Sequence, residues 1–153
     1  MSMNRKYRLN SGPRRPQRGV GLIEVLIAVI VMAIGLLGLA GLQIRTLRNN
    51  ESASERGAAV VQTHSIIDAM RADRTNATNN AFNIDFATAT PTGSTFHEKA
   101  ISAWRSNLTA ALGSAAKGQI DCNGARCTVT VQWDDSRATN GSRTYSIVTV
   151  VQL

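Results

Sequence analysis

The sequence is poor in the residues from which metal sites and catalytic centres are built. Its 153 residues include two cysteines and two histidines, and His64 and His97 lie far from Cys122 and Cys127 along the chain. Structural zinc sites need four ligands at recognisable spacing, so these four residues make a poor zinc set. The chain also has no glycine-rich loop suited to a phosphate and no catalytic set of serine, histidine and carboxylate. We therefore expect no enzymatic activity, no cofactor and no small-molecule substrate.

Acidic side chains are absent from the first 19 residues, which hold six of the seventeen basic side chains. Residues 20–153 hold eleven basic and ten acidic side chains, so the net charge of +7 belongs almost entirely to the N-terminal segment. Because phosphate contacts dominate binding to nucleic acids, the nearly neutral remainder argues against a nucleic-acid partner. The length suits one domain and excludes a two-domain enzyme of ordinary size.

Charge is also absent from the twenty residues between Val25 and Ile44, in which Gln43 is the only strongly polar side chain. About 20 helical residues cross a hydrocarbon core about 30 Å thick, so this run predicts a membrane-spanning helix. The basic residues before it favour a cytoplasmic N-terminus, with the C-terminal part outside. A cleaved secretory signal would need a shorter apolar core and a cleavage site of small residues, which residues 42–44 do not provide. An uncleaved membrane anchor stays open as an alternative.

Glu24 immediately precedes this apolar run. A carboxylate near the bilayer interior is costly, so an ionisable residue there predicts a functional site; a glutamate that reaches water at the interface is the alternative. Residues 19–28, with the sequence GVGLIEVLIA, resemble the processing site of type IV prepilins. In that family a basic leader ends in glycine, glutamate is the fifth residue of the mature chain, and a long apolar helix follows.

The resemblance implies that a membrane prepilin peptidase cuts after Gly19 and methylates the new amine of Val20. The chain would then consist of a leader (residues 1–19), a transmembrane and filament-core helix (20–44) and a periplasmic pilin-like head (45–153). The subunit would wait in the bacterial inner membrane with its N-terminus in the cytoplasm and then enter a pilus. Glu24 would meet the methylated amine of a neighbouring subunit, because two charges buried in an apolar bundle must compensate each other.

Two further stretches are similar to the minor pilins called PilV, the type IV pilus modification proteins. They are residues 34–43 (IGLLGLAGLQ) and residues 127–137 (CTVTVQWDDSR). This resemblance implies a minor pilin that helps to start or modify a fibre used in adhesion and twitching motility. Its partners would be other minor pilins, the major pilin and inner-membrane lipid. A minor pseudopilin of a type II secretion system and a DNA-binding pilin of a competence apparatus are the alternatives.

Helical periodicity extends beyond the apolar run. Apolar residues recur at helical spacing between Ala59 and Met70, and they predict one helix from residue 20 to residue 71 with a break near residues 74–76. The expected stripe is interrupted by Thr63 and His64 and contains Ala59, Val60, Ile66, Ile67 and Met70. Residues 73–95 predict a long loop, which a short strand or the apolar side chains of Phe82, Ile84 and Phe86 would pin to the head.

A second helix is expected over residues 95–113, with Ser94 or Thr95 as its cap; Glu98 would complete a capping box with Thr95. Its predicted apolar face contains Phe96, Ile101, Trp104, Leu108 and Leu112. We expect Trp104 to pack in the core.

The C-terminal residues alternate between apolar and polar, which predicts strands over residues 127–133 and 145–151 joined by a hairpin connection. Asp134 and Asp135 are expected to be solvated turn residues, with calcium binding as the alternative. Cys122 and Cys127 flank a turn-like stretch, and an oxidising compartment would join them in a disulfide. The expected fold is therefore α+β and pilin-like: a long N-terminal α-helix packed on a small antiparallel β-sheet head.

Overall fold

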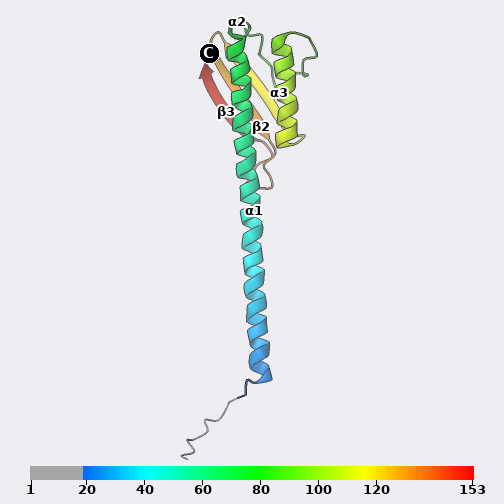
Figure 1. Ribbon diagram of the computed structural model, residues 1–153, viewed down its shortest axis with the longest axis vertical. Helices are drawn as coiled ribbons and strands as arrows, with labels where there is room; N and C mark the ends of the chain where they lie inside the picture. Colours follow the sequence, from blue (N-terminus) through cyan, green and yellow to red (C-terminus); the bar gives the residue numbers. More distant parts are fainter. Residues whose placement is uncertain (1–18) are drawn as a thin grey trace, which may run out of the picture. The chain divides into compact units, whose positions relative to one another are not determined.

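The computed structural model describes residues 19–153, so residues 1–18 of the expected leader lie outside the described residues. The elements in chain order are α1 (Leu22–Ala72), α2 (Arg74–Thr78), α3 (Phe96–Leu112), β1 (Lys117–Asn123), β2 (Arg126–Trp133) and β3 (Tyr145–Gln152), as labelled in Figure 1. The chain divides into two compact units, of which the first ends at Leu39 and the second, here called the head unit, runs from Ala40 to Leu153.

The described part of the first unit is the N-terminal stretch of α1. Its side chains are exposed along the whole stretch, including large apolar residues such as Ile30 and Leu37, which are 50 % and 74 % exposed. The helix passes through Gly35 and Gly38 without interruption. Backbone hydrogen bonds are satisfied within such a helix, so its apolar side chains alone determine which surroundings it tolerates.

The head unit begins with the remainder of α1, whose buried residues are spaced by seven, then by three or four, residues and so lie on one face. This face consists of Ser52, Ala59, Thr63, Ile66, Ile67 and Met70. The predicted stripe was wrong at two positions, because Val60 is 43 % exposed and Thr63 is buried. The Thr63 hydroxyl donates to the carbonyl of Ala59 at 2.8 Å, and this bond within the helix allows the polar side chain to lie in the core.

The predicted helix break is confirmed at Asp73, since α1 ends at Ala72 and the short α2 begins at Arg74. The loop predicted over residues 73–95 was wrong at residues 74–78, which form α2. The segment after α2 is pinned to the sheet as the sequence suggested, because Phe82 and Ile84 are buried and Ile84 forms an antiparallel bridge with Ile120. The side chain of Asn83 adds two hydrogen bonds to the backbone of Cys122, at 2.8 and 3.1 Å. The loop is therefore attached to β1.

The second predicted helix is confirmed as α3 (Phe96–Leu112), which starts at the expected capping box. The backbone N–H of Thr95 donates to Glu98 at 3.1 Å. Hydrogen bonds from Thr95 to the carboxylate hold the pKa of Glu98 below its ordinary value. Phe96 was wrongly placed on the apolar face, as it is 53 % exposed. Five residues correspond to about 500° of rotation, which turns Phe96 about 140° away from Ile101.

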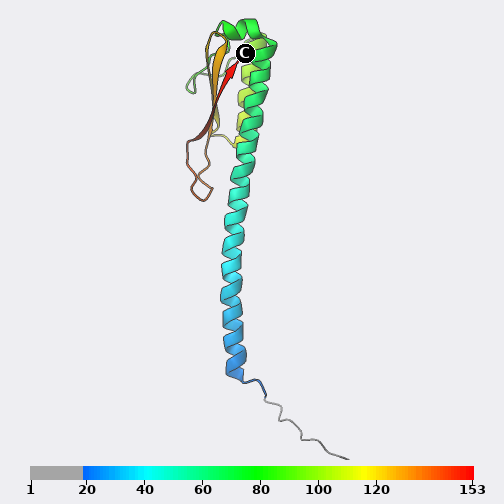
Figure 2. The ribbon, with the colours of Figure 1, turned by 90° about the vertical axis from the view of Figure 1, so that its left-hand side faces the viewer.

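The head contains a three-stranded antiparallel sheet in the order β1-β2-β3. Strands β2 and β3 were predicted, whereas β1 was not. Alternate residues of β2 are fully buried, as the alternation indicated: Cys127, Val129, Val131 and Trp133. Figure 2 shows α1 and α3 on one side of the sheet. The core between these layers contains residues from all of them, and the predicted α+β class is confirmed.

Trp104 lies in this core, where it is 3 % exposed and its Nε1–H donates to the carbonyl of Gln62 at 3.0 Å. It packs against the backbone of β1, since a methyl group at Gly118 would lie 2.4 Å from the indole ring. The core role that we expected for Trp104 is therefore confirmed, and Gly118 makes the close contact possible.

Candidate processing and assembly site

The residues expected at the cleavage site lie just before the first helical turn. Gly19, Val20 and Gly21 are exposed and precede α1, whose first turn begins at Leu22. A methyl group at Gly19 would meet no atom of the described residues within 4 Å, its chain neighbours left aside. The peptide bond between Gly19 and Val20 thus lies outside the helix and joins two exposed residues, as a protease needs for its substrate.

Glu24 lies in the first turn of α1, and its side chain is exposed. Its backbone N–H donates to the carbonyl of Gly21 at 3.0 Å, so the helix is already formed at this residue. A carboxylate is favourable here because the N-terminus of a helix carries partial positive charge. Glu24 is also four residues after Val20, which would be the first residue after cleavage at Gly19.

In the described part of the chain, the apolar side chains of α1 that follow Glu24 are exposed and pack against no other segment. α1 is long and apolar enough to cross a membrane, and none of its most apolar 18-residue stretch is buried. Exposed contiguous apolar surface of this extent marks a site of protein or membrane contact. This stretch therefore needs lipid or other apolar helices around it.

The connection between β2 and β3 is fastened to α1 through Asp135, which the sequence had not indicated. The Asp135 carboxylate is 2 % exposed, accepts a hydrogen bond from Ser52 at 2.9 Å and pairs with Arg56 at 3.2 Å. The expectation of a solvated turn residue was therefore wrong for Asp135. A burial of this kind is stable because the carboxylate has both a hydrogen-bond donor and a cation as partners.

Two other contacts fasten the same connection. Arg137 pairs with Glu51 at 3.1 Å and with Glu55 at 3.2 Å. At Gly141 a methyl group would lie 1.7 Å from the carbonyl oxygen of Asp135, so only glycine fits there. We call the connection of residues 134–144 together with these partners the α1 latch.

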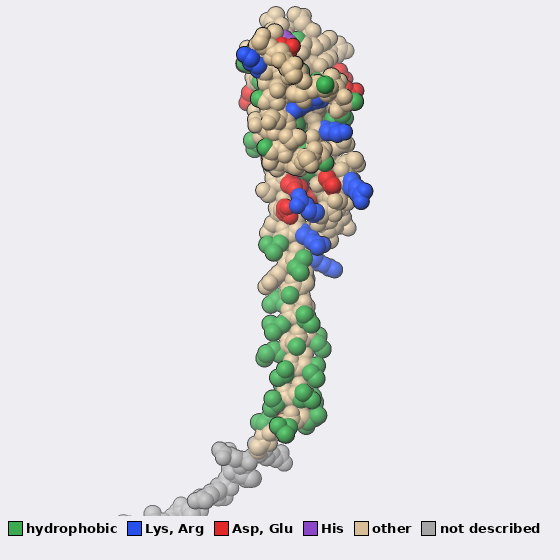
Figure 3. Space-filling model, turned by 90° about the vertical axis from the view of Figure 1, so that its right-hand side faces the viewer, with side chains coloured by type: hydrophobic (Ala, Val, Ile, Leu, Met, Phe, Trp, Pro, Cys, Tyr) green, Lys and Arg blue, Asp and Glu red, His purple; other side chains and the backbone are tan. Residues whose placement is uncertain are grey.

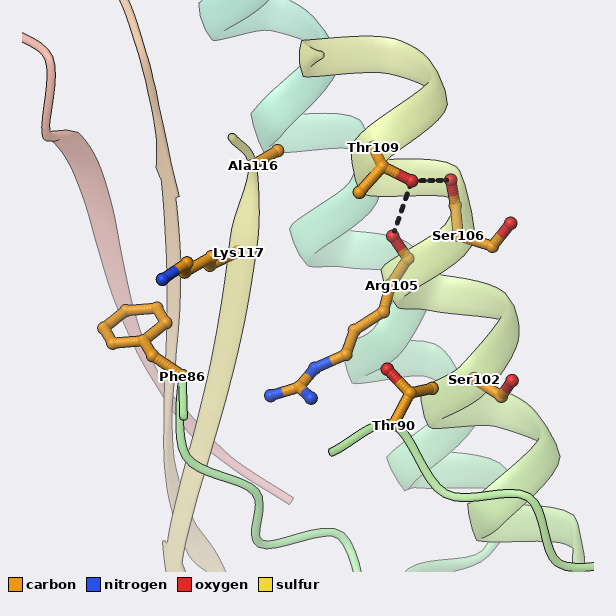
Figure 4. A pocket seen from close by; sticks show the side chains of 8 residues that line it. All are labelled: Phe86, Thr90, Ser102, Arg105, Ser106, Thr109, Ala116 and Lys117. Atoms are coloured by element: carbon orange, nitrogen blue, oxygen red, sulfur yellow. Dashed lines mark hydrogen bonds between the residues drawn. The ribbon is translucent and has the colours of Figure 1, made fainter. Parts of the chain in front are cut away.

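Arg105 fastens another segment of the head. It lines a cavity of about 350 Å³ and extends from α3 toward β1, as Figure 4 shows. Its guanidinium donates to the carbonyls of Thr88 and Asp85 and, at 3.0 Å, to that of Gly118. Burial lowers the pKa of Arg105, and the nearby charge of Asp85 opposes this effect. Because its two terminal nitrogens donate to three carbonyls, Arg105 holds residues 85–88 against the sheet.

Cys122 and Cys127 form a disulfide. They are directly opposite each other in the register of β1 and β2 and lie at the end of the pair next to the turn. The bridge therefore closes the hairpin from which the sheet is built.

In the part of the chain that the structure describes, no three histidine, cysteine, aspartate or glutamate side chains come close enough to hold a metal ion. His64 is exposed on α1. His97 lies with its ring centroid 5.9 Å from that of Phe82. The two histidines thus lie in separate surroundings.

Comparison with known proteins gave one match. Residues 14–40 match the model of the prokaryotic N-terminal methylation motif. No curated protein and no solved structure matches the chain. The matched residues include Gly19, Val20 and Glu24, and their first five lie outside the described residues.

The chain therefore carries the N-terminal methylation motif of prokaryotic prepilin-like proteins, which indicates a type IV pilin-like protein. The motif implies processing by a prepilin peptidase and assembly with other pilins. It suggests a structural subunit, and with the long apolar helix it fits a membrane-anchored pilin.

Proposed function

We propose that this chain is a minor pilin of a type IV pilus, similar to PilV, and that it acts in starting or modifying the fibre. The observation that carries the proposal is the methylation motif, which overlaps the exposed apolar part of α1. Such a helix suits lipid before assembly and the apolar centre of a filament afterwards. The PilV part of the proposal rests on the similarity of residues 34–43 and 127–137.

Processing removes residues 1–19 and exposes the amine of Val20, which the peptidase then methylates. The geometry supports this step because the bond after Gly19 is exposed and precedes the helix. Cleavage also removes six basic side chains, so the mature chain keeps its apolar helix without the basic segment that set its orientation.

Assembly places the N-terminus of one subunit among the apolar helices of its neighbours. A methylated amine remains a cation, and leaving it unpaired in such surroundings costs several kcal/mol. Glu24 of the adjacent subunit supplies the opposite charge, which is the role of this carboxylate in the proposal. The head lies in the periplasm, an oxidising compartment that suits the Cys122–Cys127 disulfide.

The proposal is tested by following a tagged chain into sheared pili of its bacterial host. The chain should appear in the pilus fraction together with the major pilin and other minor pilins. Recovery with the subunits of a type II secretion system would contradict the pilus assignment in favour of a pseudopilin. Salt-sensitive DNA binding by the chain would favour the competence alternative.

A matched pair of variants tests the role of Glu24. Glu24→Gln keeps the size of the side chain and should leave cleavage intact while lowering the amount in pili at least tenfold. Gly19→Val should block cleavage, because the added bulk stands at the scissile bond, and it should leave the chain in the membrane. Normal entry of the Glu24→Gln variant into pili would contradict the ion pair.

A further inference from the structure

Arg45 and Arg48 follow the apolar run by one and four residues, on the exposed surface of α1 in the head unit. Among the described residues neither guanidinium has an ion-pair partner. Their immediate apolar neighbours are also exposed, with Ile44 52 % and Leu47 68 % exposed. Two free cations thus lie where apolar helix surface gives way to polar surface.

The carboxylates that follow these arginines on α1, and the one on the connection packed beside it, already have ion-pair partners. Glu51 and Glu55 pair with Arg137, and Asp135 pairs with Arg56. Figure 3 shows acidic and basic side chains grouped at this end of the head, beside apolar side chains of α1. Glu51, Glu55 and Asp135 therefore already have cationic partners, which leaves Arg45 and Arg48 for an anion from outside.

Residues 138–140, the tip of the α1 latch, lie beside the part of α1 that directly follows Arg48. A cavity of about 350 Å³ is lined by Asn49, Ser52, Ala53 and Arg56 on α1 and by Ala138, Thr139 and Asn140 on the connection. Asn49 is five residues beyond Ile44, which is about 7.5 Å along the helix axis. A headgroup layer is about 5–7 Å thick on each side of the hydrocarbon core. Arg45 and Arg48 would therefore lie within this layer, with the latch tip at its outer edge.

We propose that Arg45 and Arg48, beneath the tip formed by residues 138–140, bind the phosphate of an anionic phospholipid. This inference rests on the proposed membrane anchoring of α1. Arginine suits the site because its planar guanidinium donates two parallel hydrogen bonds to a phosphate. The amide and hydroxyl groups of Asn49 and Thr139 offer hydrogen bonds to headgroup oxygens.

The site has a consequence for the mature subunit. Once residues 1–19 are removed, Arg45 and Arg48 are the only basic side chains within ten residues of the apolar run. They fix the depth of the helix in the outer layer of the membrane until assembly. An anionic lipid is favoured over a zwitterionic one by about fivefold for each arginine near the surface.

The test is native mass spectrometry of the full chain released from micelles that contain equal amounts of phosphatidylglycerol and phosphatidylcholine. We expect bound phosphatidylglycerol to exceed phosphatidylcholine, and the double variant Arg45→Gln/Arg48→Gln to lose about fivefold in this preference for each arginine. Residues 1–19 are common to all variants, so the differences between variants report on the two arginines. The variant Arg45→Lys/Arg48→Lys keeps both charges and should keep most of the preference.

The control variant is Arg71→Gln/Arg74→Gln, which removes the same charge from exposed positions at the other end of α1 and beyond it. It should bind phosphatidylglycerol as the unchanged chain does. Equal loss in both glutamine variants, or no loss in either, would overturn the lipid site while leaving the anchoring intact. Failure of the full chain to enter micelles or vesicles would overturn the membrane anchoring and the lipid site together.

Discussion

Replacing Asp135 by alanine should release the connection between β2 and β3 from α1. The change removes the acceptor of the Ser52 hydroxyl, at 2.9 Å, and the partner of Arg56, at 3.2 Å. Ser52 is 7 % exposed, and a buried hydroxyl left without a partner costs about 1–3 kcal/mol. Arg56 is 47 % exposed, so solvent screens its ion pair, which adds about 0–1 kcal/mol. The two contributions sum to about 1–4 kcal/mol, and we expect the head to lose an amount near the middle of this range, about 2–3 kcal/mol.

The assay is thermal unfolding of the full chain in detergent, followed by near-ultraviolet circular dichroism. Trp133 is fully buried and meets the ring of Tyr145 at 5.0 Å, edge to face, close to the latch, so this signal reports on the head. A loss of 2–3 kcal/mol lowers the unfolding temperature of a domain of about 100 residues by about 8–15 °C.

Asp68→Asn is the matched control, because Asp68 is exposed and its pair with Arg71 is at the surface. It should change stability by less than about 0.5 kcal/mol. The variants Ser52→Ala, Asp135→Ala and their combination form a double-mutant cycle, in which we expect a coupling of about 1 kcal/mol. Additive effects of the two changes, or an unfolding temperature for Asp135→Ala equal to that of the control, would refute the latch.

Three further predictions concern the stability of the head. Cys122→Ser/Cys127→Ser should lower its stability by about 2 kcal/mol, because the bridge closes a short loop; an unchanged unfolding temperature would contradict this. The pKa of Glu98 is lowered in the folded state, so its contribution is complete above its ordinary pKa of 4.5 and is lost as the pH falls through the lower folded value. The loss should be absent in Glu98→Gln when unfolding is followed against pH. Gly118→Ala should destabilise the head by about 1–3 kcal/mol in chemical denaturation, since the added methyl overlaps Trp104; a neutral result would contradict the close contact.

The elements with strong periodicity were predicted correctly from the sequence. α3 has a capping box and apolar residues at helical spacing, and β2 alternates along its whole length. β1 was missed because its sequence KGQIDCN contains glycine and only two apolar side chains, Ile120 and Cys122. Its strand conformation depends on pairing with β2 and on the bridge to Ile84, neither of which a local pattern reveals.

The candidate site was likewise predicted only in part from the sequence. Gly19, Val20 and Glu24 could be predicted because their motif is contiguous, and they lie within residues 14–40, which match the methylation motif. The α1 latch was not identified, because Asp135 meets a serine that lies 83 residues earlier in the chain. A pair of aspartates in a turn looks solvated until the packing of that turn is known.

The central claim, that this chain is processed as a prepilin, is tested most directly by the intact mass of the protein. The chain is expressed with a prepilin peptidase, extracted from the membrane and measured by mass spectrometry. The account predicts the loss of residues 1–19 and the gain of one methyl group on Val20. A membrane-bound chain that keeps residues 1–19, or one cut after a residue other than Gly19, would contradict it.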